Sequence, residues 1–188
     1  MNNISNFFSN FKIQKIKILP KKFKNFLTRS PLKDIFESKT IDIHSKGKFP
    51  SNVLSNFQES KFQFEGIQIE SMEGFLQSLK TTDNSIQKKV CKMKGKDAKE
   101  FGINLIGKFK MENLNWQGKN INRYSEDYQD LLRKVYRAKF EQDPLFRKAL
   151  EATKGKDLTH SIGKHLKEET ILTEEEFITI LNWLRFSI

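Results

Sequence analysis

Three polar residues stand in one helical register and could form a small reaction centre. Glu73, Gln77 and Lys80 are four and then three positions apart, so a helix would align a carboxylate, an amide and an ammonium. An ionised carboxylate can stabilise the oxocarbenium-like state that forms when a bond to ribose C1 breaks, or it can orient an attacking water. The alternative is a solvated ladder with ordinary support between side chains one turn apart. Spacing alone leaves both open.

An N-cap residue and apolar residues at helical spacing predict the helix that would carry these residues. Ser71 is a suitable N-cap, and it puts Glu73 in the first turn, where free N–H groups and the helix dipole favour an anion. An ionised role is therefore easier to support than a general acid, although burial in a cleft would raise the pKa. The apolar residues behind the cap recur at helical spacing and predict a buried face: Met72, Phe75, Leu76 and Leu79.

A second candidate segment runs from Thr159 to Lys164. Its hydroxyl, its imidazole at His160 and its lysine surround a glycine, as in a loop that holds a phosphate or a base. The alternative is a polar turn between helices. Trp116 could stack on a base or belong to the core, and no metal site is expected because His160 and His165 lack a third ligand.

The surrounding elements predict a helix-dominated α+β domain. Alternation over residues 62–69 indicates a strand pair or a bend, and a short strand is expected within 108–118. Helices are expected over 85–93, 97–102, 126–140 and 144–153. The last helix should begin at the capping box of Thr173 and Glu176.

Composition places the chain among single-domain proteins. It has 188 residues and one cysteine, Cys91, so no internal disulfide can form. Cys91 is expected to be structural, and its reduced state suits the cytoplasm. No apolar run approaches the roughly 20 residues of a membrane helix, so no membrane span is expected.

The net charge of +11 lies mainly at the N-terminus. Residues 1–48 contain 11 Lys and Arg against three acidic residues, whereas the remaining 140 contain 23 and 20. We therefore expect a basic extension over residues 1–39 and a domain over 40–188. The extension could steer the protein to nucleic acid, resemble an organelle-targeting peptide, or pack on the domain through its Phe residues.

Several motifs together resemble the NADAR superfamily of YbiA-like proteins. Leu54-Ser55-Asn56-Phe57 resembles the first family motif, and residues 71–80 resemble its S-x-E-x-x-x-Q-x-x-K helix. Residues 95–102 are similar to its A-K-x-x-G segment. Trp116, Lys139-Phe140, Gln142 and residues 150–153 follow in the expected order.

The resemblance implies a YbiA-like domain that acts on N-glycosidic bonds without a cofactor. Family substrates include phosphorylated ribosylamino-pyrimidines and ADP-ribose attached to nucleobases. Glu73 matches the family's principal catalytic glutamate. The residues then expected at the substrate are Asn56, Phe57, Gln77, Lys80, Trp116, Thr159, His160 and Lys164.

One departure marks a distinct branch. Many family members carry an acidic residue and a D-x-x-W-G-x-G stretch where this chain has residues 158–164. The substrate of the better-known branch therefore does not transfer directly. A non-catalytic module that binds ADP-ribose or nucleic acid is the alternative to an enzyme.

Overall fold

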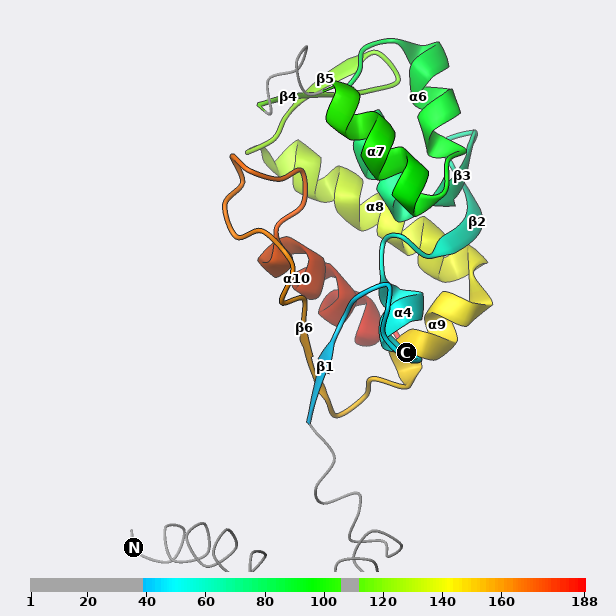
Figure 1. Ribbon diagram of the computed structural model, residues 1–188, viewed down its shortest axis with the longest axis vertical. Coiled ribbons are helices and arrows are strands. Elements are labelled where there is room, and N and C mark those ends of the chain that lie inside the picture. Colours follow the sequence, from blue (N-terminus) through cyan, green and yellow to red (C-terminus); the bar gives the residue numbers. More distant parts are fainter. Residues whose placement is uncertain (1–38, 106–111) are drawn as a thin grey trace, which may run out of the picture. The chain divides into compact units, whose positions relative to one another are not determined.

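The computed structural model describes residues 39–105 and 112–188, so the predicted basic extension falls almost wholly outside the described residues. Figure 1 shows the arrangement of the elements. In chain order they are β1 (Thr40–Asp42), α4 (Ser51–Leu54), β2 (Glu59–Phe64), β3 (Ile67–Ser71), α5 (Met72–Ser78), α6 (Asn84–Cys91), α7 (Gly95–Leu105), β4 (Asn113–Trp116), β5 (Lys119–Asn122), α8 (Glu126–Gln142), α9 (Pro144–Glu151), β6 (Asp157–Thr159) and α10 (Glu174–Arg185). The predicted helix-rich α+β class is confirmed.

The helices begin where their capping residues predict. Ser71 Oγ accepts the Gly74 N–H at the start of α5, and Thr173 and Glu176 form the expected capping box of α10. Helix α7 is longer than predicted, because Gly102 does not end it. The bare Cα of Gly102 instead lies against Gln77 of α5, where an added Cβ would come within 1.9 Å of Gln77 Oε1.

Two antiparallel hairpins turn through left-handed residues. Glu65 and Gly66 connect β2 to β3, and Gln117 and Gly118 connect β4 to β5, all with positive φ. Such two-residue turns match the twist of the flanking strands. The two turns also touch, since Trp116 Nε1 donates to Glu65 Oε2 at 2.8 Å.

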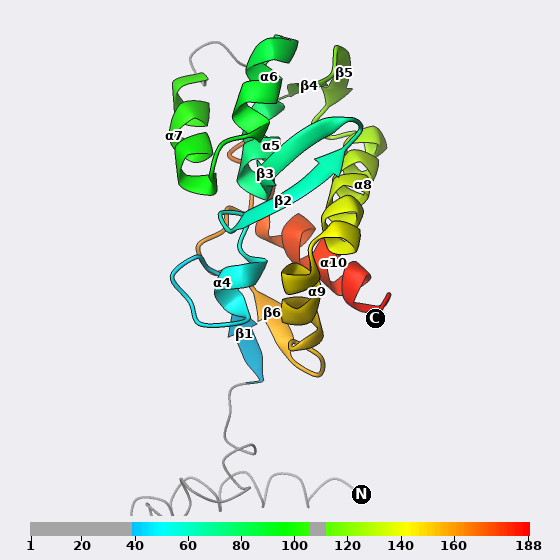
Figure 2. The same cartoon turned by 90° about the vertical axis from the view of Figure 1, so that its right-hand side faces the viewer.

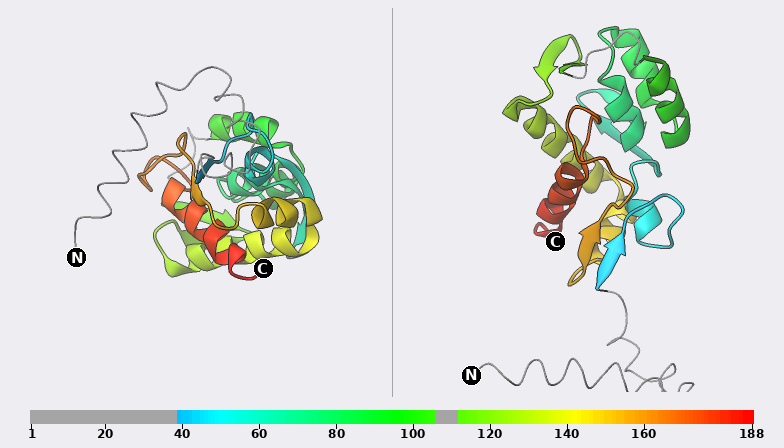
Figure 3. Two further views of the ribbon diagram at one scale, coloured as in Figure 1. Left: turned by 90° about the horizontal axis from the view of Figure 1, so that it is seen from below. Right: turned by 60° about the vertical axis from the view of Figure 1, so that its left-hand side comes forward.

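A parallel pair, β1 with β6, joins the beginning and the end of the described domain. Ile41 lies opposite Leu158, and Ile43 N–H donates to Thr159 O at 2.8 Å. Figure 3 shows this pair at the end of the domain away from β4 and β5. These strands were not predicted, because three residues are too few for an alternating pattern.

The core forms where α8 packs on β2, α9 and α10, and where β3 packs on α5 and α6. In Figure 2, β2 lies toward α8 and β3 toward α5 and α6. Met72, Phe75, Leu76 and Leu79 are all buried, as their helical spacing predicted. Helix α5 is buried along its whole length, so its polar residues are enclosed as well.

Candidate functional site

A cavity of about 230 Å³ lies beside helix α5. Its walls come from the α4–β2 loop, from α5 and α7, from the turn after β6, and from residues 170–173 with Phe177 of α10. Five of the predicted site residues line it: Asn56, Phe57, Glu73, His160 and Lys164. Segments more than 100 residues apart in sequence therefore supply a single site.

Glu73 presents a buried carboxylate to this cavity. The residue is 5% exposed, and its Oε1 accepts a hydrogen bond from Gln77 Nε2 at 2.7 Å. Lys99 Nζ of α7 lies 3.4 Å from the same oxygen. The backbone N–H of Glu73 donates to Asn56 O at 2.9 Å, so the start of α5 is tied to another wall of the cavity.

The stripe of Glu73, Gln77 and Lys80 is buried, so the alternative of a solvated ladder is wrong. Gln77 is fully buried and Lys80 is 7% exposed. Burial, followed by the positive charge of Lys99, lowers the pKa of Lys80 to about 8, although Glu73 opposes the shift. The two outer members of the stripe therefore interact electrostatically within the fold.

Asn56 and Phe57 reach the cavity from the α4–β2 loop. Asn56 Oδ1 accepts a hydrogen bond from the hydroxyl of Tyr136 at 2.7 Å. Burial raises the pKa of Tyr136 well above its ordinary value, which keeps this phenol a donor. With its oxygen engaged in this way, Asn56 retains an amide NH₂ group for other partners.

The turn after β6 carries His160 and Lys164. Asp42, at the end of β1, accepts hydrogen bonds from the backbone and the hydroxyl of Ser161, at 2.8 and 2.6 Å. These bonds lower the pKa of Asp42. His160 Nδ1 lies 2.6 Å from Ile43 O, while Lys164 is exposed and lies 3.8 Å from Glu169.

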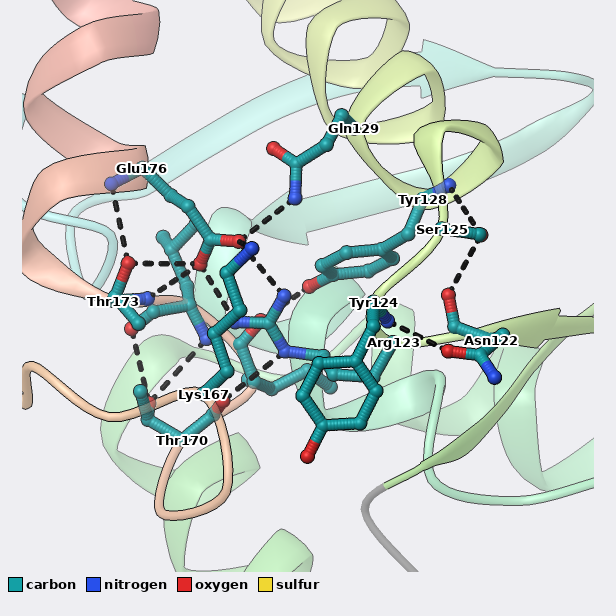
Figure 4. A network of polar contacts seen from close by, with 12 residues as sticks. Asn122, Arg123, Tyr124, Ser125, Tyr128, Gln129, Lys167, Thr170, Thr173 and Glu176 are labelled. Atoms are coloured by element: carbon teal, nitrogen blue, oxygen red, sulfur yellow. Dashed lines mark hydrogen bonds and ion pairs between the residues drawn. The ribbon is translucent and has the colours of Figure 1, made fainter.

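The wall formed by residues 170–173 is held by a buried ion pair. Arg123 is fully buried, and its two terminal nitrogens donate to Glu176 at 2.8 and 2.6 Å. Arg123 Nε also donates to Thr170 O at 3.2 Å, and Tyr128 Oη donates to Ile171 O. Figure 4 shows this network of α8, α10 and the segment between β6 and α10.

Four predicted site residues do not line this cavity. Gln77 and Lys80 lie behind Glu73, and the Thr159 hydroxyl donates to Asp42 Oδ1 at 3.2 Å. Trp116 is 4% exposed, stacks on Phe64 and borders a different groove. Its indole packs in the core because the β4–β5 hairpin turns it toward the β2–β3 hairpin.

Lys99, Tyr136 and Arg123 are site residues that the sequence analysis did not single out. Lys99 stands within the A-K-x-x-G segment, so the family motif could have indicated it. Its contact with Glu73 on α5 could not be seen from that motif. Tyr136 and Arg123 carried no local signal, because each acts on a segment at least 40 residues away.

Comparison with known proteins identifies the family. A model of the bacteriophage protein GP30.3 family matches residues 48–186. The chain belongs to the GP30.3 family. An uncharacterized 17.1 kDa protein encoded in the Gp30-rIII intergenic region of Enterobacteria phage T4 is 39% identical over 149 residues, 79% of this chain and 98% of that protein.

The GP30.3 family is of the NADAR type, and a solved structure supports the same fold. The NMR structure of the Escherichia coli protein YbiA aligns with a TM-score of 0.54 and 19% identity, over 79% of this chain and 83% of YbiA. The resemblance to the NADAR superfamily drawn from the motifs is thus confirmed.

The described residues contain neither a metal-binding cluster nor a membrane-spanning helix. Within 39–105 and 112–188, no three His, Cys, Asp or Glu side chains gather as ligands of an ion would. The same part of the chain contains no helix with the length and apolarity needed to cross a membrane. Cys91 is buried, and burial raises the pKa of its thiol to about 11, as suits a structural cysteine.

Proposed function

We propose that this member of the GP30.3 family hydrolyses the bond between ribose C1 and a nucleobase nitrogen. The substrate class is an ADP-ribosylated nucleobase or a phosphorylated ribosylamino-nucleobase. The observation that carries the proposal is the buried carboxylate of Glu73, which faces a cavity and is held by Gln77 and Lys99. We also propose that a basic extension over residues 1–39 precedes a domain over residues 40–188.

Glu73 supplies the negative charge that the reaction needs. As the C1–N bond lengthens, positive charge develops on C1 and the ring oxygen, and a fixed carboxylate stabilises it. Gln77 donates to one oxygen of Glu73, which restricts the carboxylate to one orientation. The same carboxylate can accept a proton from the water that attacks C1.

The cations around the cavity suit the phosphate groups of such a substrate. Lys99 and Lys164 line the cavity, and both are exposed enough to reach a ligand. Lys80 adds positive charge from behind Glu73, and its pKa of about 8 leaves it mostly protonated at pH 7. The NH₂ group of Asn56 is available for a ribose hydroxyl or for the attacking water.

The test compares wild type with Glu73→Gln on ADP-ribosylated DNA, NAD and a ribosylamino-pyrimidine phosphate. We expect release of free base by wild type and a loss of at least about 10³-fold in kcat for the variant, because an amide cannot stabilise the cation or accept the proton. Glu70→Gln is the matched control, since Glu70 lies on β3 and pairs with Lys61 outside the cavity. It should keep wild-type turnover.

If wild type forms no product in this experiment, the proposed glycosidase activity is rejected. ADP-ribose that raises the melting temperature of both wild type and Glu73→Gln, without turnover by either, would favour the alternative of a non-catalytic binding module. Equal turnover by wild type and Glu73→Gln would contradict the role given to Glu73.

A further inference from the structure

His160 lines the same cavity as Glu73 and is held by contacts on several sides. Its Nδ1 lies 2.6 Å from Ile43 O, and its backbone N–H donates to Glu174 Oε1 at 2.9 Å. Its ring meets Phe177 edge-on, with the centroids 5.3 Å apart. The imidazole is thus fixed by β1 and by α10, and its orientation is determined before any ligand binds.

These contacts fix which ring nitrogen is free. A backbone carbonyl only accepts hydrogen bonds, so Nδ1 must carry a hydrogen. Within the described residues Nε2 has no hydrogen-bond partner. In the same residues, the buried polar side-chain atoms without a hydrogen-bond partner are Asn52 Oδ1, Gln77 Oε1 and Lys139 Nζ. His160 Nε2 is not among these buried atoms. Nε2 is therefore accessible on a residue that lines the cavity.

We propose that His160 is the general acid of the reaction and protonates the departing nucleobase. This inference rests on the proposed function. The C1–N bond breaks with its electron pair on the base nitrogen, and that nitrogen takes the proton from Nε2 of the imidazolium. Water forms the new bond to C1 and gives its proton to Glu73. Transfer of that proton through solvent then restores Glu73 and the imidazolium.

The bond to Ile43 suits both states of this cycle. Nδ1 donates to the carbonyl when the ring is an imidazolium, and it still donates after Nε2 has lost its proton. No ring flip or change of tautomer is needed between the two states. An acid separate from Glu73 also leaves Glu73 ionised throughout bond cleavage, as its charge-stabilising role requires.

Charged groups approach His160 from each element packed against it. Glu174 of α10 contacts its backbone, and Asp42 of β1 binds the neighbouring Ser161. Glu73 and Lys99 line the same cavity from α5 and α7, and Lys164 lies in the same turn. Because these groups also shape the cavity or hold its walls, the test alters His160 itself.

The experiment measures kcat and KM for His160→Gln and His160→Ala on the substrate that wild type cleaves. Loss of a general acid should lower kcat by about 10²–10⁴-fold while KM changes little. Added imidazole should restore part of the activity of His160→Ala, in proportion to the imidazolium concentration. His165→Ala is the matched control, because His165 is exposed in the same loop and lies outside the cavity lining.

Each outcome separates this inference from the proposed function. Turnover by wild type with unchanged kcat in both His160 variants would overturn the acid role and leave the glycosidase intact. A loss of ADP-ribose affinity by calorimetry that matches the loss of kcat, without rescue by imidazole, would show a structural or binding role only. Absence of any product from wild type would overturn the proposed function, and this inference with it.

Discussion

In the described part of the chain, two lysines are buried, and they differ in their surroundings. Lys80 lies behind Glu73, so a carboxylate partly offsets the cost of its burial. Lys139 of α8 is fully buried, and its Nζ has no hydrogen-bond partner in the described part of the chain. The face of Phe146 lies close to it, with 4.4 Å from Nζ to the ring centroid. Burying a charge without an ion-pair or hydrogen-bond partner costs stability.

We expect Lys139→Met to stabilise the protein. Burial lowers the pKa of Lys139 to about 8, with the charge of Asp143 opposing the shift, so folding at pH 7 must enclose a charged amine. Methionine keeps the length of the side chain without the charge, and the gain should be on the order of 1–3 kcal/mol. The gain should be greatest below pH 8 and shrink between pH 8 and about 10.4, where the folded amine is neutral.

Urea unfolding at pH 7 and pH 9.5 measures this effect. Lys148→Met on α9 is a control for the change of residue type. Equal stability of Lys139→Met and wild type at pH 7 would show that the contact with Phe146 compensates the buried charge.

At the scale of elements, a buried ion pair shapes one wall of the cavity. Arg123 follows β5, and Glu176 stands in the first turn of α10. Arg123 also binds Thr170 O, so the pair connects β5, the segment before α10, and α10 itself. Burial raises the pKa of Glu176, but hydrogen bonds from Arg123, Thr173 and Gln129 outweigh it and lower the pKa to about 2.

Glu176→Gln should therefore remove a pH-dependent part of the stability. A carboxyl whose folded pKa is depressed stabilises the fold above its unfolded pKa of about 4.3, and this stabilisation is lost as the pH falls toward about 2. At pH 7 the variant leaves Arg123 buried without its counter-charge and should lose roughly 3–5 kcal/mol. Near pH 2 the variant and wild type should converge.

Chemical unfolding followed from pH 7 to pH 2 tests this expectation, with the exposed Glu175→Gln as the control on the same helix. A constant difference between Glu176→Gln and wild type across this range would contradict the assigned pKa.

Over the whole molecule, the positive charge is concentrated in the predicted extension. Residues 1–30 contain seven Lys and Arg and no acidic residue, whereas residues 49–188 are nearly balanced. A local charge of this size attracts polyanions through release of their counterions. The cavity, by contrast, is built wholly from described residues beyond position 39.

Deletion of residues 1–30 should weaken binding to a DNA duplex by at least about tenfold at 50 mM salt and flatten its salt dependence. Affinity for free ADP-ribose should stay unchanged, because the cavity lies elsewhere in the chain. Fluorescence anisotropy across a salt series measures the first quantity and calorimetry the second. Unaltered DNA binding after the deletion would exclude the extension as a polyanion site.

Features that depend on neighbours along the chain could be predicted from the order of the residues alone. Caps such as Ser71 and Thr173 satisfy N–H groups only two or three residues away, so their motifs predict helix starts directly. The buried face of α5 and the glycine break at Gly66 are local in the same sense. The family motif over residues 71–80 indicated Glu73, and the polar segment over residues 159–164 indicated His160. The fold brings both residues to one cavity.

Contacts between side chains that are far apart in the sequence could not be predicted before the packing of the elements was known. The pairing of β1 with β6 holds His160 in place, and the approach of α7 to α5 brings Lys99 to Glu73. The packing of the β4–β5 hairpin likewise places Trp116 in the core instead of the cavity. Such contacts depend on how whole elements pack, because the energy that selects them comes from burial and charge pairing between segments that share no local pattern.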